Sequence, residues 1–309
     1  MSPLHVISRL AGSALLVSLV LQLAVEPLLG AVASIPAAAD LPSRIFFGFL
    51  SGFLTLAVLV IAVRRSSLSG KRLGWAVFTL LFGLDLLALP EAAAFLHLPW
   101  PQLVGMGLGG LVRAAMLTGL LLGALGKVGR PAASATVRSG AGLSWPSTVW
   151  RLGLCALSYL VLFIAAGLLI WPLVAEFYQQ QPMIDPLLMF ALELLRGVGL
   201  AAILLPLCRS LRYGRRGTAL TCGLLLSLLG GAAVLIDPNP FMPGWVRLAH
   251  TLEIGWSNFV FGMIVGLLFA LREGRKRTDE PMPDPTDYHA ANTLISTRGI
   301  RAVGATEQL

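Results

Sequence analysis

Residues 45–65 read IFFGFLSGFLTLAVLVIAVRR, a run that carries no charge until it ends at Arg64 and Arg65. A helix needs about 20 apolar residues to cross the roughly 30 Å of hydrocarbon in a bilayer. Backbone groups that face lipid must satisfy one another, so such a run is expected to be helical. The stretch therefore predicts a membrane-spanning helix that ends at a positively charged side.

The rest of the chain repeats this pattern. Its 309 residues are 56% hydrophobic and only 12% charged, whereas soluble domains carry about 25% charged residues. We therefore expect an all-α membrane protein with eight transmembrane helices. The expected spans cover residues 10–33, 45–63, 73–96, 103–126, 152–175, 187–208, 217–236 and 246–271.

The basic residues predict the orientation of these spans. Most of the 23 Lys and Arg residues precede the first span, follow the second, fourth and sixth spans, or lie in the C-terminal tail. Short loops rich in Lys and Arg stay in the cytoplasm. We therefore expect a multi-pass protein of the cell (inner) membrane with both termini cytoplasmic. Anionic lipid headgroups are possible partners of the basic loops, although topology alone explains these charges.

Three other interpretations of the composition are less favoured. The net charge of +8 could indicate a nucleic-acid partner, but the charges are scattered between apolar runs. The three cysteines have no paired spacing, so neither disulfides nor a zinc site is expected. Residues 1–40 resemble a signal peptide, but their apolar run is longer than the usual core of such a signal. We expect the first span to be retained.

The two halves of the chain look related at a spacing close to 143 residues. Basic loops match after the second and sixth spans, and an Arg-Leu pair precedes the first and fifth spans. Four spans per unit would give both units the same direction across the membrane. The matched positions are Arg9 with Arg151, Pro42 with Pro186, Ser66 with Ser210, Gly119 with Gly262 and Gly123 with Gly266.

This duplication predicts the organisation of the chain. Residues 1–126 and 151–272 form the two four-helix repeats, which a pseudo-two-fold axis along the membrane normal would relate. Residues 127–150 are rich in Gly, Ser, Ala and Pro and are expected to be a cytoplasmic linker. Residues 273–309 are polar without apolar periodicity and are expected to be disordered.

Ionisable side chains inside the spans indicate a candidate site, because a charge at that depth normally faces protein or water. They gather between the middle and the outer face of the expected bundle. The predicted intramembrane polar site consists of Glu26, Asp85, Arg113, Glu193, Arg196, His250, Glu253 and Asn258. The structural alternative is that these groups only pair with one another and lock the bundle together. In that case Asp85 would pair with Arg113, and Glu193 with Arg196 three residues along the same helix.

No motif names a reaction, so no catalytic residue, metal ligand or cofactor is assigned. His250 and Glu253 share a helix face, but the chain has no H-E-x-x-H sequence. Ser257 lies two turns from His250, and no G-x-S-x-G sequence occurs. Whether the protein is an enzyme stays uncertain, with the balance against it.

The leading functional hypothesis is a permease-like or solute-binding bundle whose polar site opens to the outer face. In it, Glu253 and Glu26 exchange protons or bind cations, and His250 orients Glu253. Arg113 and Arg196 balance charge or hold an anionic group. The alternatives are a non-transporting subunit that docks an unidentified membrane partner and, more weakly, a membrane-embedded enzyme or heme or metal protein.

Overall fold

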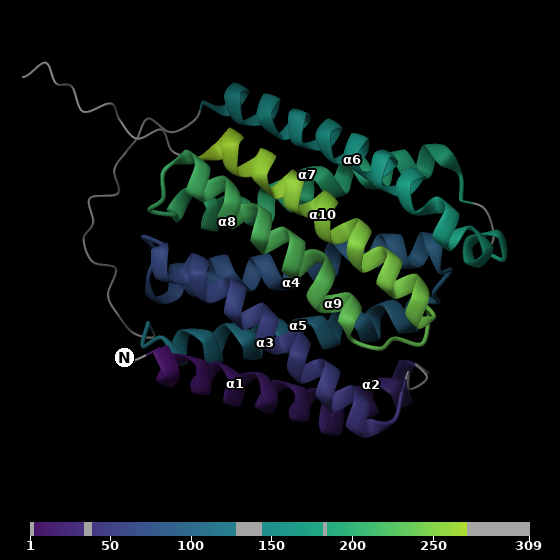
Figure 1. The fold of residues 1–309 in the computed structure, drawn as a ribbon, viewed down its shortest axis with the longest axis horizontal. Coiled ribbons are helices and arrows are strands. Elements are labelled where there is room, and N and C mark those ends of the chain that lie inside the picture. Colours follow the sequence, from purple (N-terminus) through teal and green to yellow (C-terminus); the bar gives the residue numbers. More distant parts are fainter. Residues whose placement is uncertain (1–2, 34–38, 128–143, 182–183, 271–309) are drawn as a thin grey trace, which may run out of the picture. The chain divides into compact units, whose positions relative to one another are not determined.

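The computed structural model describes residues 3–33, 39–127, 144–181 and 184–270, which form a bundle of helices (Figure 1). The predicted tail and most of the predicted linker lie outside these residues. The elements in chain order are α1 (Pro3–Val20), η1 (Leu21–Val25), α2 (Glu26–Ala33), α3 (Leu41–Arg65), α4 (Gly70–Phe95), α5 (Trp100–Ala124), α6 (Trp145–Gln179), α7 (Pro186–Ser210), α8 (Arg215–Ser227), η2 (Leu228–Ala232), α9 (Ala233–Ile236) and α10 (Gly244–Phe269).

Eight stretches of the described chain are helical, long enough and apolar enough to cross a membrane. Each coincides with one of the eight expected spans, so the prediction of an all-helical bundle with eight such helices is confirmed. The first stretch joins α1, η1 and α2, and the seventh joins α8, η2 and α9. The π-helical segments η1 and η2 each interrupt an otherwise α-helical run.

Two helices extend well beyond the expected spans. The first begins at Pro3 rather than at residue 10, and α6 begins at Trp145, inside the predicted linker. The 35 residues of α6 span about 52 Å at 1.5 Å per residue. Hydropathy locates only the apolar part of a helix, whereas the helix itself continues wherever its backbone bonds can continue.

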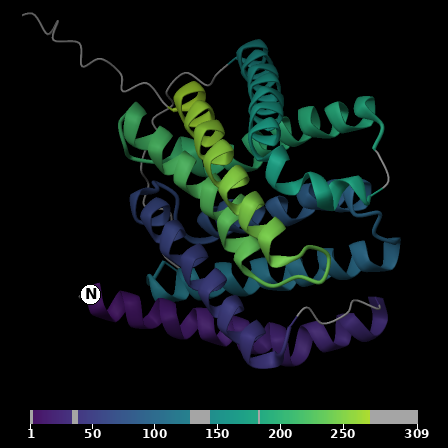
Figure 2. The same cartoon turned by 45° about the vertical axis from the view of Figure 1, so that its right-hand side comes forward.

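The packing partners of the helices follow a regular scheme (Figure 2). In the first half, α1 packs against α3 and α5, and α4 packs against α5. In the second half, α6 packs against α7 and α10, and α8 packs against α10. Between the halves, α4 contacts α7, while α3 contacts α8, η2 and α9. The two halves of the chain therefore share one helical core.

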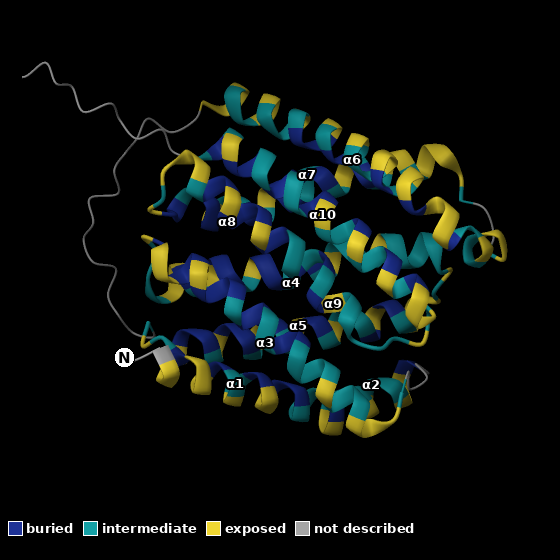
Figure 3. Ribbon diagram, in the orientation of Figure 1, coloured by how far each residue is buried: buried dark blue, intermediate teal, exposed yellow. Residues whose placement is uncertain are grey.

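Many large apolar residues lie on the exposed side of the helices, whose exposed positions Figure 3 marks. On α6, Leu168 is 72% exposed and Leu169 is 68% exposed, while Leu200 and Leu204 of α7 are fully buried. A soluble monomer rarely exposes a large contiguous apolar surface. Leucines of this kind are suited to contact with lipid chains.

Basic side chains donate hydrogen bonds to carbonyl groups at several helix ends. Arg9 donates to the carbonyl of Ala124 at the end of α5, at 3.4 Å, and Arg151 donates to that of Leu268 near the end of α10, at 2.5 Å. Lys127 donates to the carbonyl of Val63 at 2.9 Å. The last carbonyls of a helix have no partner within the helix, and cations there satisfy them. These residues therefore stabilise helix ends.

Candidate functional site

The predicted polar residues separate into two groups of three, and two of them lie outside both groups. The first group, the acid–histidine site, consists of Glu193, His250 and Glu253 together with Tyr178. The second group, the arginine cluster, consists of Glu26, Asp85 and Arg113 together with Arg44, Asp237 and Arg247. Asn258 is isolated from both, and Arg196 lies beside the acid–histidine site.

A chain of hydrogen bonds runs through the acid–histidine site. The imidazole Nδ1 of His250 lies 2.6 Å from Oε2 of Glu253, one turn further along α10. The other ring nitrogen, Nε2, lies 2.8 Å from the hydroxyl of Tyr178, near the end of α6. The two rings are perpendicular, with centroids 5.8 Å apart. Both nitrogens of His250 are therefore engaged, and the ring is fixed between a phenol and a carboxylate.

Glu193 of α7 belongs to this site, although it forms no hydrogen bond with the other three residues. Its side chain is fully buried, and neither of its carboxylate oxygens has a hydrogen-bond partner among the described residues. The charge of Glu253 acts directly on Glu193. The two carboxyl groups come from different helices, and Glu253 is only 7% exposed. The site therefore places two buried acids within electrostatic reach of each other.

The predicted pair of Glu193 and Arg196 is wrong. Arg196 instead forms an ion pair with Glu91 of α4, across the contact between α4 and α7. Its guanidinium also lies over the ring of Tyr159, 5.9 Å from the ring centroid. Helical spacing allows the local pair, but Arg196 reaches a carboxylate on another helix, and Glu193 is left beside Glu253.

The arginine cluster contains two ion pairs. The predicted pair of Asp85 and Arg113 is present, and it joins α4 to α5. Gly110 makes this possible, because a Cβ there would lie 2.7 Å from Oδ2 of Asp85. Glu26 pairs with Arg44 of α3 at 3.2 Å and accepts a hydrogen bond from Gln22 at 2.5 Å.

Asp237 joins this cluster from the loop that follows α9. Its backbone carbonyl accepts a hydrogen bond from Arg247 at 3.4 Å. Burial raises the pKa of the Asp237 carboxyl to about 6, and the negative charge of Glu26 adds to this effect. The positive charges of Arg113, Arg247 and Arg44 oppose it.

The pKa of Asp237 predicts a pH-dependent stability. The folded protein binds a proton at Asp237 more tightly than the unfolded chain does, so the contribution of this residue falls as pH rises from about 4 to about 6. Asp237→Asn removes the titration. We expect its melting temperature in detergent to exceed that of the wild type by a margin that grows between pH 4.5 and pH 7. A margin that shrinks over this range would contradict the assignment.

Asn258 makes a separate contact with the π-helical segment η2. Its side-chain nitrogen donates to the carbonyl of Gly230 at 3.3 Å, and its side-chain oxygen has no partner among the described residues. A π-helical turn breaks the regular bonding of an α-helix and often occurs at functional sites. Here the amide group satisfies one carbonyl of the widened turn.

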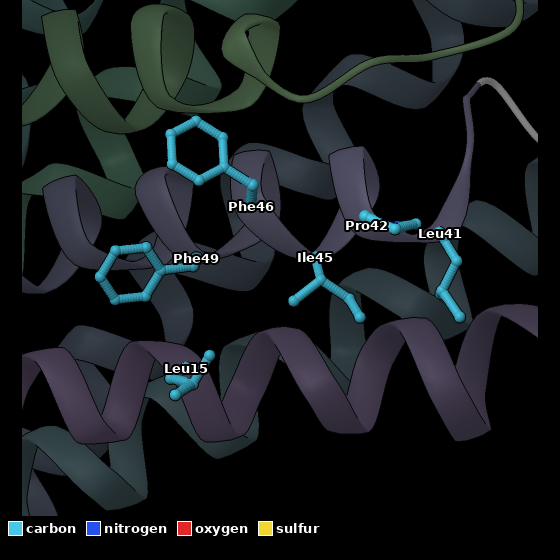
Figure 4. Close-up of a pocket in the computed structure, with 6 residues that line it drawn as sticks. All are labelled: Leu15, Leu41, Pro42, Ile45, Phe46 and Phe49. Carbon is cyan, nitrogen blue, oxygen red and sulfur yellow. The ribbon is translucent and has the colours of Figure 1, made fainter.

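Two grooves on the outside of the bundle are apolar and do not belong to the polar site. One lies between α1 and α3 (Figure 4), and its residues are Leu15, Leu41, Pro42, Ile45, Phe46 and Phe49. The other lies between α6 and α7 and includes Trp150 and Leu157. Both grooves suit lipid chains rather than a charged solute. The buried polar residues therefore remain the candidate binding site.

Tyr178, Arg44, Asp237 and Arg247 were not among the predicted site residues. The spacing of Arg247 and His250 on one helix face was the only signal for Arg247. Tyr178, Arg44 and Asp237 lie at the ends of helices, where an aromatic or charged residue is ordinary. Their involvement depends on which helix ends meet, and the order of residues along the chain does not contain this information.

The fold and site place the described part of the chain among helical proteins with eight helices long and apolar enough to cross a membrane and with buried ionisable groups. Comparison with protein-family models found no match, and comparisons with characterised proteins and with solved structures found none. Among the described residues, no group of three or more His, Cys, Asp or Glu side chains is arranged to hold a metal ion.

Proposed function

We propose that this is an inner-membrane protein with eight crossings, both termini in the cytoplasm and a duplicated four-helix unit. The apolar length of the helices supports insertion. The gathering of basic residues at the ends where α4, α6 and α8 begin supports the orientation.

Matching contacts in the two halves support the duplication. Helices α3 and α7 both have 25 residues, and each begins after an aspartate, Asp40 or Asp185, whose side chain accepts a backbone hydrogen bond. Arg9 and Arg151 both donate to a carbonyl in the last turn of their own half's final helix. A contact that recurs at equivalent positions is a stronger sign of duplication than a match of apolar residues.

The helix crossings match as well. A Cβ on Gly52 of α3 would lie 3.5 Å from the Cβ and 3.6 Å from the Cα of Ala14 in α1. A Cβ on Gly197 of α7 would lie 3.0 Å from the Cα of Ala156 in α6. Small residues let two helices approach closely. The first two helices of each unit therefore cross at a Gly–Ala contact.

The two units meet at equivalent residues. Ser66 and Ser210 share a hydrogen bond of 2.7 Å between their hydroxyl oxygens. The backbone N–H of Ser67 donates to the carbonyl of Ser210, and that of Arg212 donates to the carbonyl of Arg65. A spacing of 145 residues relates Ser67 to Arg212 and Arg65 to Ser210, so each of the two bonds is the counterpart of the other. This spacing is one residue longer than the spacing between Ser66 and Ser210. A pseudo-two-fold axis passing through this contact accounts for this relation.

Cross-linking tests this contact. The double variant Ser66→Cys/Ser210→Cys, with Cys208→Ala to remove a nearby thiol, should form an internal disulfide in high yield on mild oxidation. The hydroxyl oxygens are 2.7 Å apart, and a disulfide needs Cβ atoms about 3.5–4.5 Å apart. Mass spectrometry would detect the linked peptides. Ser67→Cys/Ser210→Cys is the matched control, and a higher yield in the control would contradict this placement of the axis.

We further propose that the protein is permease-like and that its buried acids bind a cation in exchange with the outer face. One observation carries this function: Glu193 is fully buried beside Glu253 and has no hydrogen-bond partner among the described residues. Two buried carboxylates whose charges act on each other cannot both stay ionised without a large cost. A proton or another cation therefore belongs to the site.

Charge displacement in reconstituted vesicles tests this function. Vesicles with purified protein are adsorbed on an electrode and exposed to sudden jumps of proton, sodium or potassium concentration. At least one jump should displace charge, and Glu193→Gln/Glu253→Gln should abolish the signal. Glu176→Gln, at an exposed acid of α6, is the control and should keep it. A folded wild-type protein that gives no signal with any of these cations would refute the function.

A second function, a non-transporting subunit that docks a membrane partner, has one observation in its favour. Asp85, Glu91 and Glu26 are all in ion pairs with arginines. Paired charges can serve only to hold helices in register. This alternative predicts a stoichiometric partner after purification in mild detergent, together with no charge displacement by the isolated protein.

A further inference from the structure

The hydrogen bonds from Tyr178 through His250 to Glu253 form a path from one end of the bundle into its interior. Tyr178 is the second-last residue of α6, and His250 lies in the second turn of α10. Glu253 lies about 14 Å along α10 and Glu193 about 11 Å along α7, at 1.5 Å per residue. The path therefore leads inward from Tyr178 through His250 to the two acids, which lie at similar distances from the starts of their helices.

We propose that the exchanged cation is a proton, and that Tyr178 and His250 carry it from the outer end of the bundle to Glu253 and Glu193. This inference rests on the proposed function and names its ion and its route. The supporting geometry is the pair of short contacts, 2.8 Å between Tyr178 and His250 and 2.6 Å between His250 and Glu253. Hydroxyl, imidazole and carboxyl groups can each accept one proton and release another.

One proton enters the route at Tyr178 for each proton that reaches Glu253. A hydronium ion at the outer end gives a proton to the phenolic oxygen of Tyr178 and becomes water. The phenol releases its own proton to Nε2 of His250, and Nδ1 of His250 releases its proton to Oε2 of Glu253. One proton has then moved from water to Glu253, and the imidazole is left as the other neutral tautomer. Glu193 is the next acceptor on the route, because the charge of Glu253 acts on it and both of its carboxylate oxygens lack a hydrogen-bond partner among the described residues.

The groups around Glu193 and Glu253 leave these two acids as the proton acceptors of the site. Arg196 acts electrostatically on this site, but its own charge is already balanced by Glu91. Tyr159 of α6 is buried and lies within the field of both acids. Gly167 of α6 lies beside Glu253, since a Cβ there would be 4.0 Å from Oε1 of Glu253. The acid pair is thus the part of the site whose charge changes.

Tyr178 and His250 are relay residues, so removing them should affect the rate of charge movement more than its amount. In the same electrode assay, a pH jump should displace charge, while sodium and potassium jumps at constant pH should not. His250→Gln should slow the relaxation by at least about 100-fold, the lower end of the usual contribution of a positioned proton donor or acceptor. Tyr178→Phe removes one hydroxyl and should slow it in the same sense without disturbing the fold.

Four outcomes are distinguishable. Slower relaxation with an unchanged total charge in both variants supports the route. A signal from sodium or potassium that disappears in Glu193→Gln/Glu253→Gln overturns the proton assignment but leaves the proposed function standing. A proton signal with the wild-type rate in both relay variants overturns the route. The absence of any signal from a folded wild-type protein refutes the proposed function and this inference with it.

Discussion

Gly262→Ala should destabilise the protein by about 3 kcal/mol, the upper end of the usual cost of overpacking a tight contact. A Cβ at Gly262 would overlap the backbone oxygen of Cys222 and lie 2.8 Å from the Cα of Gly223. Both atoms belong to the backbone of α8, so no side chain can rotate away. The helices α8 and α10 would have to separate, and with them a large part of the second half.

The first half of the chain provides the matched control. Gly119 is the sequence match of Gly262, and a Cβ there would meet nothing within 4 Å. Alanine is a better helix former than glycine by up to about 1 kcal/mol, so Gly119→Ala should be neutral or slightly stabilising. Thermal unfolding in detergent measures both. Equal effects of the two substitutions would contradict the packing of α8 on α10.

Arg196→Met should destabilise the protein by about 3 kcal/mol, because it leaves the carboxylate of Glu91 partly buried without its partner. The side chain of Glu91 is 21% exposed. Because water still reaches it, the expected loss of stability is at the lower end of the range for broken buried ion pairs. Unfolding in detergent at pH 7 measures this loss. The cost should fall at low pH, where the carboxylate can bind a proton.

A second substitution identifies the true partner of Arg196. Glu91→Gln/Arg196→Met should recover most of the lost stability, because no unpaired charge remains. Glu193→Gln/Arg196→Met should not recover it, because Glu193 is not the partner. If Glu193→Gln/Arg196→Met recovered the stability and Glu91→Gln/Arg196→Met did not, the partner of Arg196 would be Glu193, as helical spacing suggests.

The eight helices were predictable because the signal for each is long and local. A run such as residues 45–63 contains enough apolar residues to cross hydrocarbon, and nothing distant in the chain can change that. The helix ends were less predictable. Residues 145–151 read as a linker by composition, but Trp145 begins a helix that continues for 35 residues.

The site was predictable in its residue types and only partly in its pairs. The pair of Asp85 and Arg113 was predicted, since both lie at middle depth in consecutive spans. The pair of Glu193 and Arg196 was not correct, because α7 presents one side chain toward α10 and the other toward α4. Spacing along a helix identifies shared faces, but it does not identify the neighbour that each face meets.

The central claim is an eight-crossing bundle whose acid–histidine site faces the outside, and thiol accessibility tests it most directly. Gln180, after α6, and Ser67, after α3, are both exposed, while the three native cysteines are buried. Gln180→Cys and Ser67→Cys are expressed separately and treated in intact cells with a maleimide that cannot cross membranes. The account predicts that Gln180→Cys is labelled and that Ser67→Cys is labelled only after the cells are opened. Labelling of Ser67→Cys but not Gln180→Cys in intact cells would contradict it.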